Sequence, residues 1–114
     1  MKLKEIFTLT RPNTSVPFHD SSSIFFANPE TNFTTSSAHQ HFIDNYVNLG
    51  KCELTTPSLS DDGLTVTHTT IFVSEEAMQD LYSDNFFLEG LAARTEYWNN
   101  NKIAIVIDVV PVTE

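Results

Sequence analysis

The run of residues 103–110, Ile-Ala-Ile-Val-Ile-Asp-Val-Val, constrains the fold most, because every side chain in it except Asp108 is apolar. Successive side chains of a strand point to opposite faces of a sheet, so this run is apolar on both faces. A strand of that kind is typical of a sheet that is covered on both sides. The rest of the chain, or a second copy of it, must therefore supply two covering layers.

Three earlier segments are also predicted to be strands. In residues 2–10 the side chains of Leu3, Glu5, Phe7 and Leu9 share one face, and the Arg11-Pro12 pair ends the run. Residues 51–59 form a second strand, in which Pro57 indicates an edge strand or a bulge. Residues 64–73 form a third strand, which Asp62-Gly63 joins to the second by a tight turn.

Two helical regions separate these strands. The first is predicted to begin at Thr35 or Ser36, which are good N-caps, and to end at Gly50, which favours a left-handed C-cap. Its buried stripe comprises Ala38, Phe42, Tyr46 and Leu49, widened by Ile43 and Val47. The second region begins at Ser74, breaks at 83–85 and continues as a longer helix over 86–99. One side of that longer helix carries Leu88, Leu91, Thr95 and Trp98.

Residues 12–33 are predicted to form a long loop that folds onto the body of the domain, with a short strand over 23–27. Three prolines and the run Ser21-Ser22-Ser23 argue against a regular element. The segment nevertheless carries several large apolar residues, which a solvated linker does not need. These include Phe18, Phe25, Phe26 and Phe33.

The order strand, helix, strand, strand, helix, strand predicts an α+β fold of the ferredoxin-like type, the split βαβ pattern βαββαβ. In that pattern one antiparallel sheet carries both helices on one face. A length of 114 residues fits one domain, residues 1–114, with the loop at 12–33 as an insertion. Since the helices cover one face only, we expect the open face to meet a second copy of the chain in a twofold homodimer.

With this element order, the Asp61-Asp62-Gly63 hairpin, the helix containing Phe86-Phe87-Leu88 and Trp98, and the apolar last strand, the chain resembles the dimeric α+β barrel group of ferredoxin-like proteins. That group includes the antibiotic-biosynthesis monooxygenases, and the resemblance covers residues 1–110. It implies two sheets packed face to face and a pocket between helices and sheet in each subunit. The loop at 12–33 departs from the compact pattern of the group. In composition the chain is also similar to small proteins of marine microbes or their phages.

The charge balance excludes several classes of partner. With 15 acidic and 6 basic residues, the formal net charge of −9 opposes binding to nucleic acid and to anionic membrane surfaces. No apolar run is long enough to span a bilayer, and the N-terminus lacks the apolar stretch of a signal peptide. Cys52 has no second cysteine to pair with, which fits a reducing cytoplasm, the location we predict.

Five residues are candidates for lining the predicted pocket, and His68 is the one candidate catalytic base among them. The set is Phe42, Tyr46, His68, Leu91 and Trp98. A partly buried histidine bonded to a neighbouring hydroxyl is the plainer interpretation of His68. Residues such as Tyr46 and Trp98 are more often core aromatics whose polar tips find a partner.

No cofactor and no metal site is predicted. His39 and His41 project about 200° apart on a helix, so a solvated helix start is favoured over a metal-binding pair. The chain has no glycine-rich phosphate loop, no CxxC, no HExxH and no GxSxG. Arg94 and Trp98 lie four residues apart and are expected to pack as a surface pair. Cys52 is expected to be a structural thiol.

Three functions remain open at this point. The first is a small dimeric domain that binds an apolar or aromatic small molecule in a pocket between helices and sheet. The second is a non-enzymatic interaction protein that uses the aromatic arm at 12–33 and the acidic surface. The third is a cofactorless enzyme resembling the monooxygenases, in which His68 acts as the base.

Overall fold

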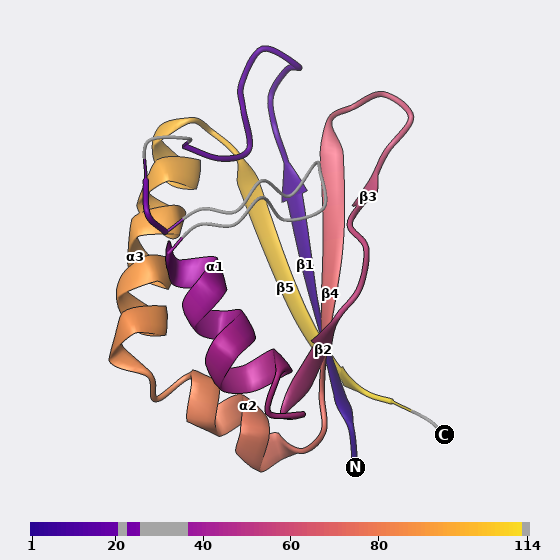
Figure 1. The fold of residues 1–114 in the computed structure, drawn as a ribbon. Coiled ribbons are helices and arrows are strands. Elements are labelled where there is room, and N and C mark those ends of the chain that lie inside the picture. Colours follow the sequence, from indigo (N-terminus) through magenta and orange to yellow (C-terminus); the bar gives the residue numbers. More distant parts are fainter. Residues whose placement is uncertain (21–22, 26–36, 113–114) are drawn as a thin grey trace.

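Five strands form one open, antiparallel sheet in the computed structural model, which describes residues 1–20, 23–25 and 37–112 (Figure 1). The sheet order is β2-β4-β1-β5, and β3 also pairs with β4. The strand bounds are β1 Leu3–Thr10, β2 Cys52–Leu54, β3 Ser58–Leu59, β4 Thr65–Phe72 and β5 Ala104–Pro111. The predicted α+β class and the predicted antiparallel sheet are therefore confirmed.

Strand β1 lies in the centre of the sheet, with β4 and β5 antiparallel on its two sides. Phe7 is paired with His68 on β4 and with Ile107 on β5. Glu5 and Leu9, two residues to either side of Phe7 on the same face, are both buried. This inner face is the one that the helices cover, as Figure 1 shows.

The helices are α1 (Ser37–Phe42), continued by the π-helix η1 (Ile43–Val47), and then α2 (Glu75–Leu81) and α3 (Asn85–Asn100). Ser74 caps α2, as predicted, by accepting a hydrogen bond of 3.1 Å from the backbone N–H of Ala77. Asp84 caps α3 at the predicted break. The predicted starting caps of the first helix, Thr35 and Ser36, lie outside the described residues.

The turn predictions are also confirmed. Gly50 and Gly63 have φ angles of +75° and +73°, in the region that favours glycine. Gly63 donates a backbone hydrogen bond of 2.9 Å to Ser60, which closes the turn before β4. Pro57 separates β2 from β3, and both of these short strands pair with the same edge of β4. The edge position that Pro57 indicated is therefore correct.

The stripe predicted for the first helix is wrong at Leu49, whose exposed fraction is 65%. The helix ends at Val47, before Leu49, with a π-helical turn in which the N–H of Asn48 donates to the carbonyl of Ile43, five residues earlier. The wider turn rotates the residues that follow it relative to a regular α-helix. Tyr46 stays buried, and Leu49 turns to solvent.

The buried face predicted for α3 is displaced by about one residue. Leu88 is 39% exposed, whereas Gly90 and Trp98 are buried and Arg94 is half-buried on the same side. Trp98 is buried as predicted. Gly90 and Arg94 are small and charged, so the more apolar positions Leu88, Leu91 and Thr95 were predicted in their place.

The described part of the long loop packs against the body, as predicted. Phe18 is completely buried, and its carbonyl accepts a hydrogen bond of 2.8 Å from the indole N–H of Trp98 on α3. Ser23, Ile24 and Phe25 form no strand, so the strand predicted over 23–27 is wrong for these residues. Its remaining part, together with Phe26 and Phe33, lies outside the described residues.

Two hydrophobic clusters hold the helices on the sheet. The first comprises Leu9, Phe18, Val66, Trp98 and Ile103. The second comprises Tyr46, Cys52, Phe72, Ala77 and Leu81. Strand β5 lies mostly outside both clusters, since Val106, Ile107, Val109 and Val110 are between 37% and 55% exposed. Within one copy of the described chain, β5 is therefore not covered on both faces.

None of the described helices is long and apolar enough to cross a membrane.

Candidate functional site

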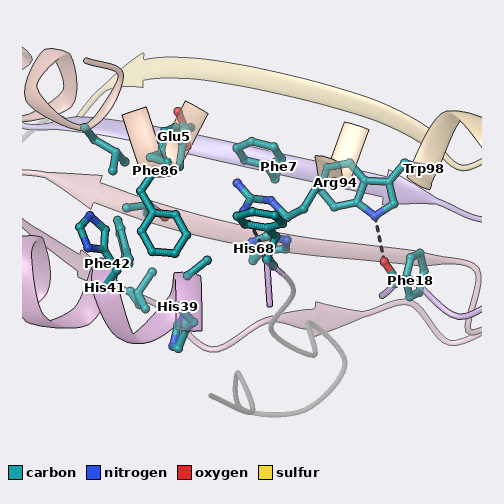
Figure 2. A pocket seen from close by; sticks show the side chains of 16 residues that line it. Glu5, Phe7, Phe18, His39, His41, Phe42, His68, Phe86, Arg94 and Trp98 are labelled. Atoms are coloured by element: carbon teal, nitrogen blue, oxygen red, sulfur yellow. Dashed lines mark hydrogen bonds between the residues drawn. The ribbon is translucent and has the colours of Figure 1, made fainter. Parts of the chain in front are cut away.

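A cavity of about 140 Å³ lies between α1, α3 and the inner face of the sheet (Figure 2). Its wall includes Phe18 and Trp98 from the first hydrophobic cluster and Leu81 from the second. It therefore lies where the two clusters leave the inner face uncovered. The other lining residues are Glu5, Phe7, Phe25, Ala38, His39, His41, Phe42, Leu54, His68, Thr70, Phe86, Phe87 and Arg94.

Three of the five predicted pocket residues line this cavity: Phe42, His68 and Trp98. Tyr46 lies in the second hydrophobic cluster and directs its hydroxyl to Asp84. Leu91 lies on the outer side of α3, in a shallow groove that it shares with Leu88 and Thr95. The displaced face of α3 explains why Leu91 does not reach the cavity.

The walls of the cavity are largely aromatic. The rings of Phe7 and His68 are stacked with their centroids 5.7 Å apart. The ring centroids of Phe86 and His41 lie 4.9 Å apart. Phe25 packs edge-on against Phe86, with their ring centroids 5.9 Å apart. Such a lining favours a flat apolar molecule, because aromatic rings contribute large contact areas with defined stacking geometries.

His68 projects from the middle of β4 into the cavity (Figure 2). Burial, assisted by the nearby positive charge of Arg94, lowers the pKa of His68 to about 4. The imidazole is therefore neutral at pH 7 and adds no charge to the site. A pKa this low also makes His68 a weak base.

Glu5 is a carboxylate on the buried side of β1, where it is only 4% exposed. The hydroxyl of Tyr82 donates a hydrogen bond to its Oε2. Burial raises the pKa of Glu5, although the Tyr82 hydrogen bond and the charge of Arg94 act in the opposite direction. Glu5 was not selected from the sequence, but a signal existed, because it shares a strand face with Leu3, Phe7 and Leu9.

Arg94 reaches the cavity from α3. Its Nη1 donates a hydrogen bond of 3.1 Å to the carbonyl of Phe25, and its guanidinium lies 5.7 Å from the ring centroid of Phe87. Burial lowers the pKa of Arg94 to about 10, opposed by Tyr82 and Glu5, so the group is still charged at pH 7. The prediction of a surface pair with Trp98 is thus wrong, since both side chains line the cavity.

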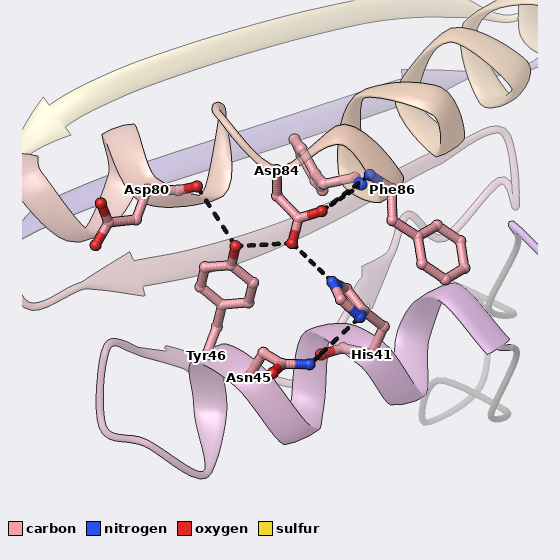
Figure 3. A network of polar contacts seen from close by, with 7 residues as sticks. His41, Asn45, Tyr46, Asp80, Asp84 and Phe86 are labelled. Carbon is pink, nitrogen blue, oxygen red and sulfur yellow. Dashed lines mark hydrogen bonds and ion pairs between the residues drawn. The ribbon is translucent and has the colours of Figure 1, made fainter.

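His41 lines the cavity and also anchors a polar network between α1 and α3 (Figure 3). Its Nε2 lies 2.7 Å from Oδ2 of Asp84, and Nδ2 of Asn45 lies 3.3 Å from its Nδ1. The same oxygen of Asp84 accepts a hydrogen bond of 2.8 Å from the hydroxyl of Tyr46. The interpretation of His39 and His41 as a solvated helix start is therefore wrong, because both side chains face the cavity.

Asp84 gathers these donors while it caps α3. Its Oδ1 accepts hydrogen bonds of 2.9 Å and 3.2 Å from the backbone N–H groups of Phe86 and Phe87. Burial alone would raise the pKa of Asp84, but the hydrogen bonds from His41, Tyr46 and Phe87 lower it to about 2. For Tyr46, burial and the adjacent Asp84 raise the pKa to about 12. Both groups therefore keep one protonation state across the neutral range.

Within the described ranges, no group of three or more His, Cys, Asp or Glu side chains is placed to hold a metal ion. Cys52 is buried, and burial together with the charge of Glu5 raises the pKa of its thiol to about 11. It therefore stays protonated at pH 7 and behaves as a structural thiol, as expected.

Comparison of the chain with protein-family models, with curated proteins and with solved structures gave no match.

Proposed function

We propose that this chain is a binding domain that holds a small molecule with an apolar or aromatic body in the cavity between α1, α3 and the sheet. The observation that carries the proposal is a cavity with aromatic walls that also contains two ionisable groups, the buried Glu5 and the half-buried Arg94. Burying charges costs free energy unless they are paired, and close packing stabilises a core more than a cavity does. A chain selected for stability alone gains from filling such a space with apolar side chains.

The fold that we propose is ferredoxin-like. The strand order β5-β1-β4-β2, with every neighbour antiparallel, supports this assignment. The proposed partner is a second copy, bound through the open sheet face to form a dimeric α+β barrel. That face presents Ile6, Ile71 and Val106 among threonines and the charged residues Lys4 and Asp108, and Val106 is 55% exposed.

Binding is favoured over the two other functions. A pKa of about 4 makes His68 a weak base at pH 7, which gives little support to a cofactorless oxygenase. Phe18 is completely buried and Phe25 packs on Phe86, so neither of these aromatics contributes an exposed docking arm. The cavity remains the feature with the clearest chemical use.

The proposal is tested by titrating the ¹⁵N-labelled protein with benzamide and following the indole N–H resonance of Trp98, the one tryptophan of the chain. Binding in the cavity should shift this resonance saturably. Ala38→Phe, which fills the cavity, should abolish the shift. Ala92→Phe, on the outer side of α3, should leave it unchanged. A titration without any shift in the unmodified protein would count against the proposal.

The dimer is tested by sedimentation at micromolar concentration. We expect a dimer that Val106→Lys converts to a monomer, because the substitution places a charge on the open face. Leu88→Lys, on the outer side of α3, is the matched control and should remain dimeric. A monomeric unmodified protein would refute the proposed dimer without affecting the cavity.

A further inference from the structure

Most N–H donors of the Arg94 guanidinium make no hydrogen bond to the described residues and are available to a ligand in the cavity. A guanidinium has five N–H donors, and within the described part of the chain one hydrogen bond, from Nη1 to the Phe25 carbonyl, is made. The group is held in place from two sides, by the ring of Phe87 and by the carbonyl of Phe25. Figure 2 shows its side chain pointing to the part of the cavity where Phe7 and His68 lie.

Close packing around Gly90 fixes this position. A Cβ atom at Gly90 would lie 2.9 Å from Nη1 of Arg94 and 3.1 Å from Cδ1 of Phe25. The absence of a side chain at Gly90 therefore lets the guanidinium and the Phe25 ring lie against α3. This arrangement directs Arg94 along the helix surface instead of out to solvent.

The charges around the cavity favour an anionic ligand. His68 is neutral at pH 7, and the imidazole of His41 is already engaged by Asp84. Burial lowers the pKa of His39, which also disfavours its cationic form. Glu5 is held by the Tyr82 hydroxyl, and its raised pKa disfavours its anionic form. Arg94 is thus the group with a permanent charge, and one added negative charge would complement it.

The size and walls of the cavity favour a single flat ring. A volume of about 140 Å³ is close to the roughly 150 Å³ of an engineered apolar cavity that holds benzene. The guanidinium matches the planar, two-oxygen geometry of a carboxylate.

We propose that the ligand is a small aromatic carboxylate, with its ring against the phenylalanine walls and its carboxylate bound by Arg94. This inference rests on the binding function proposed above and specifies the chemical class of the ligand. Arg94 is the residue that determines specificity, and the rings of Phe7, Phe42 and Phe86 accept any flat apolar body of the right size.

Three probes of nearly identical shape test the inference: benzoate, benzamide and benzamidine, with charges of −1, 0 and +1. Their dissociation constants at pH 7 are measured by calorimetry and from the Trp98 indole resonance. Benzoate should bind about tenfold tighter than benzamide, as expected for one charge-assisted hydrogen-bonded pair. Benzamidine should bind more weakly than both.

Two arginine substitutions separate the site from general effects of losing an arginine. Arg94→Gln should reduce benzoate affinity to that of benzamide and leave benzamide affinity nearly unchanged. Arg11→Gln is the matched control, because Arg11 is also buried and stacks on an aromatic ring, Phe18, at 4.5 Å. Arg11 does not line the cavity, so this variant should retain the preference for benzoate.

Gly90→Ala tests the position of Arg94 while preserving its charge. Alanine is a better helix former than glycine, so this variant is expected to fold even where Arg94→Gln does not. It should lower the preference for benzoate several-fold, because its Cβ displaces the guanidinium.

The outcomes distinguish the two proposals. Equal binding of benzoate and benzamide to the unmodified protein would overturn the carboxylate inference and leave the binding function standing. Binding of none of the three probes would overturn both. An unchanged preference for benzoate in both Arg94→Gln and Gly90→Ala would also overturn the inference, since neither variant presents the guanidinium in its place.

Discussion

Asp84 and Glu5 are two carboxylates that each accept a hydrogen bond from a tyrosine hydroxyl, yet their pKa values shift in opposite directions. Asp84 lies at the N-terminal end of α3 and accepts from His41, Tyr46 and two backbone N–H groups. Glu5 lies in mid-strand, and in the described part of the chain Tyr82 is its one hydrogen-bond donor. Glu5 is also the more deeply buried of the two, so burial dominates its pKa, whereas the hydrogen bonds to the less buried Asp84 together outweigh burial.

The difference separates a structural region from a functional one. The ionised form of Asp84 is satisfied by its neighbours, so this carboxylate stabilises the junction of α1, η1 and α3. The ionised form of Glu5 is short of donors, so it costs stability where it lies. Buried polar groups that the fold does not satisfy are frequent at binding sites, and Glu5 lines the cavity.

The largest expected effect is that of Asp84→Ala, which should lower the free energy of unfolding by about 3 kcal/mol. The change removes a helix N-cap and leaves the buried hydroxyl of Tyr46 without its acceptor on Asp84. Urea unfolding at pH 7 measures it. Asp80→Ala is the control, because the Asp80 side chain is 59% exposed. Its Oδ2 lies 3.5 Å from Nζ of Lys51, and such an exposed ion pair contributes little to stability. Similar losses in both variants would contradict the structural role of Asp84.

The loss of stability at acid pH should also depend on Asp84. The pKa of Asp84 is about 2 in the folded chain, below its ordinary value of 3.8, so its contribution is present above pH 4 to 5. That contribution, about 2 kcal/mol, is lost as the pH falls toward 2. Denaturation across pH 2–6 should therefore show a steeper loss in the unmodified protein than in Asp84→Asn. Parallel profiles would refute the assignment.

The two tyrosines should differ, although each donates to a carboxylate. Tyr82→Phe removes the one described donor of Glu5 and should cost about 1.5 kcal/mol at pH 7. Tyr46→Phe leaves Asp84 its three other donors and should cost about 0.5 kcal/mol. A loss in Tyr46→Phe as large as in Tyr82→Phe would show that donor number is not the deciding factor.

The smallest expected effect is also the one of opposite sign. Glu5→Gln keeps an acceptor for Tyr82 and removes the charge, so it should be neutral or stabilising by up to about 1 kcal/mol at pH 7. A carboxyl whose pKa is raised in the folded state loses stability as the pH rises through that pKa. The advantage of the variant should therefore grow as the pH rises above 4.5, and a variant less stable than the unmodified protein at pH 7 would contradict this.

Sequence patterns were sufficient wherever one local rule determined the structure. The strand period of two located β1 and β4, the continuous apolar run located β5, and the Asp62-Gly63 and Gly50 signals located the turns. The cap at Ser74 is a local pattern of the same kind. His68 was placed on the inner face correctly because a strand has a strict period of two.

The site was only partly predictable, because its polar residues are joined by contacts distant in sequence. Asp84 contacts His41, 43 residues away, and Glu5 contacts Tyr82, 77 residues away. The inner side of α3 carries Gly90 and Arg94, which an apolarity pattern ranks below Leu88 and Leu91. The π-helix had no recognised signal, and the helix ends at Val47, which leaves Leu49 in an exposed turn.

The thiol of Cys52 offers a way to measure how often the sheet edge opens. The side chain is 4% exposed on the short edge strand β2, and its pKa of about 11 keeps it protonated at neutral pH. An alkylating reagent should thus modify only those molecules in which β2 has detached from β4. Because the chain has one cysteine, the labelling rate reports a single opening equilibrium, with no thiol elsewhere to obscure it.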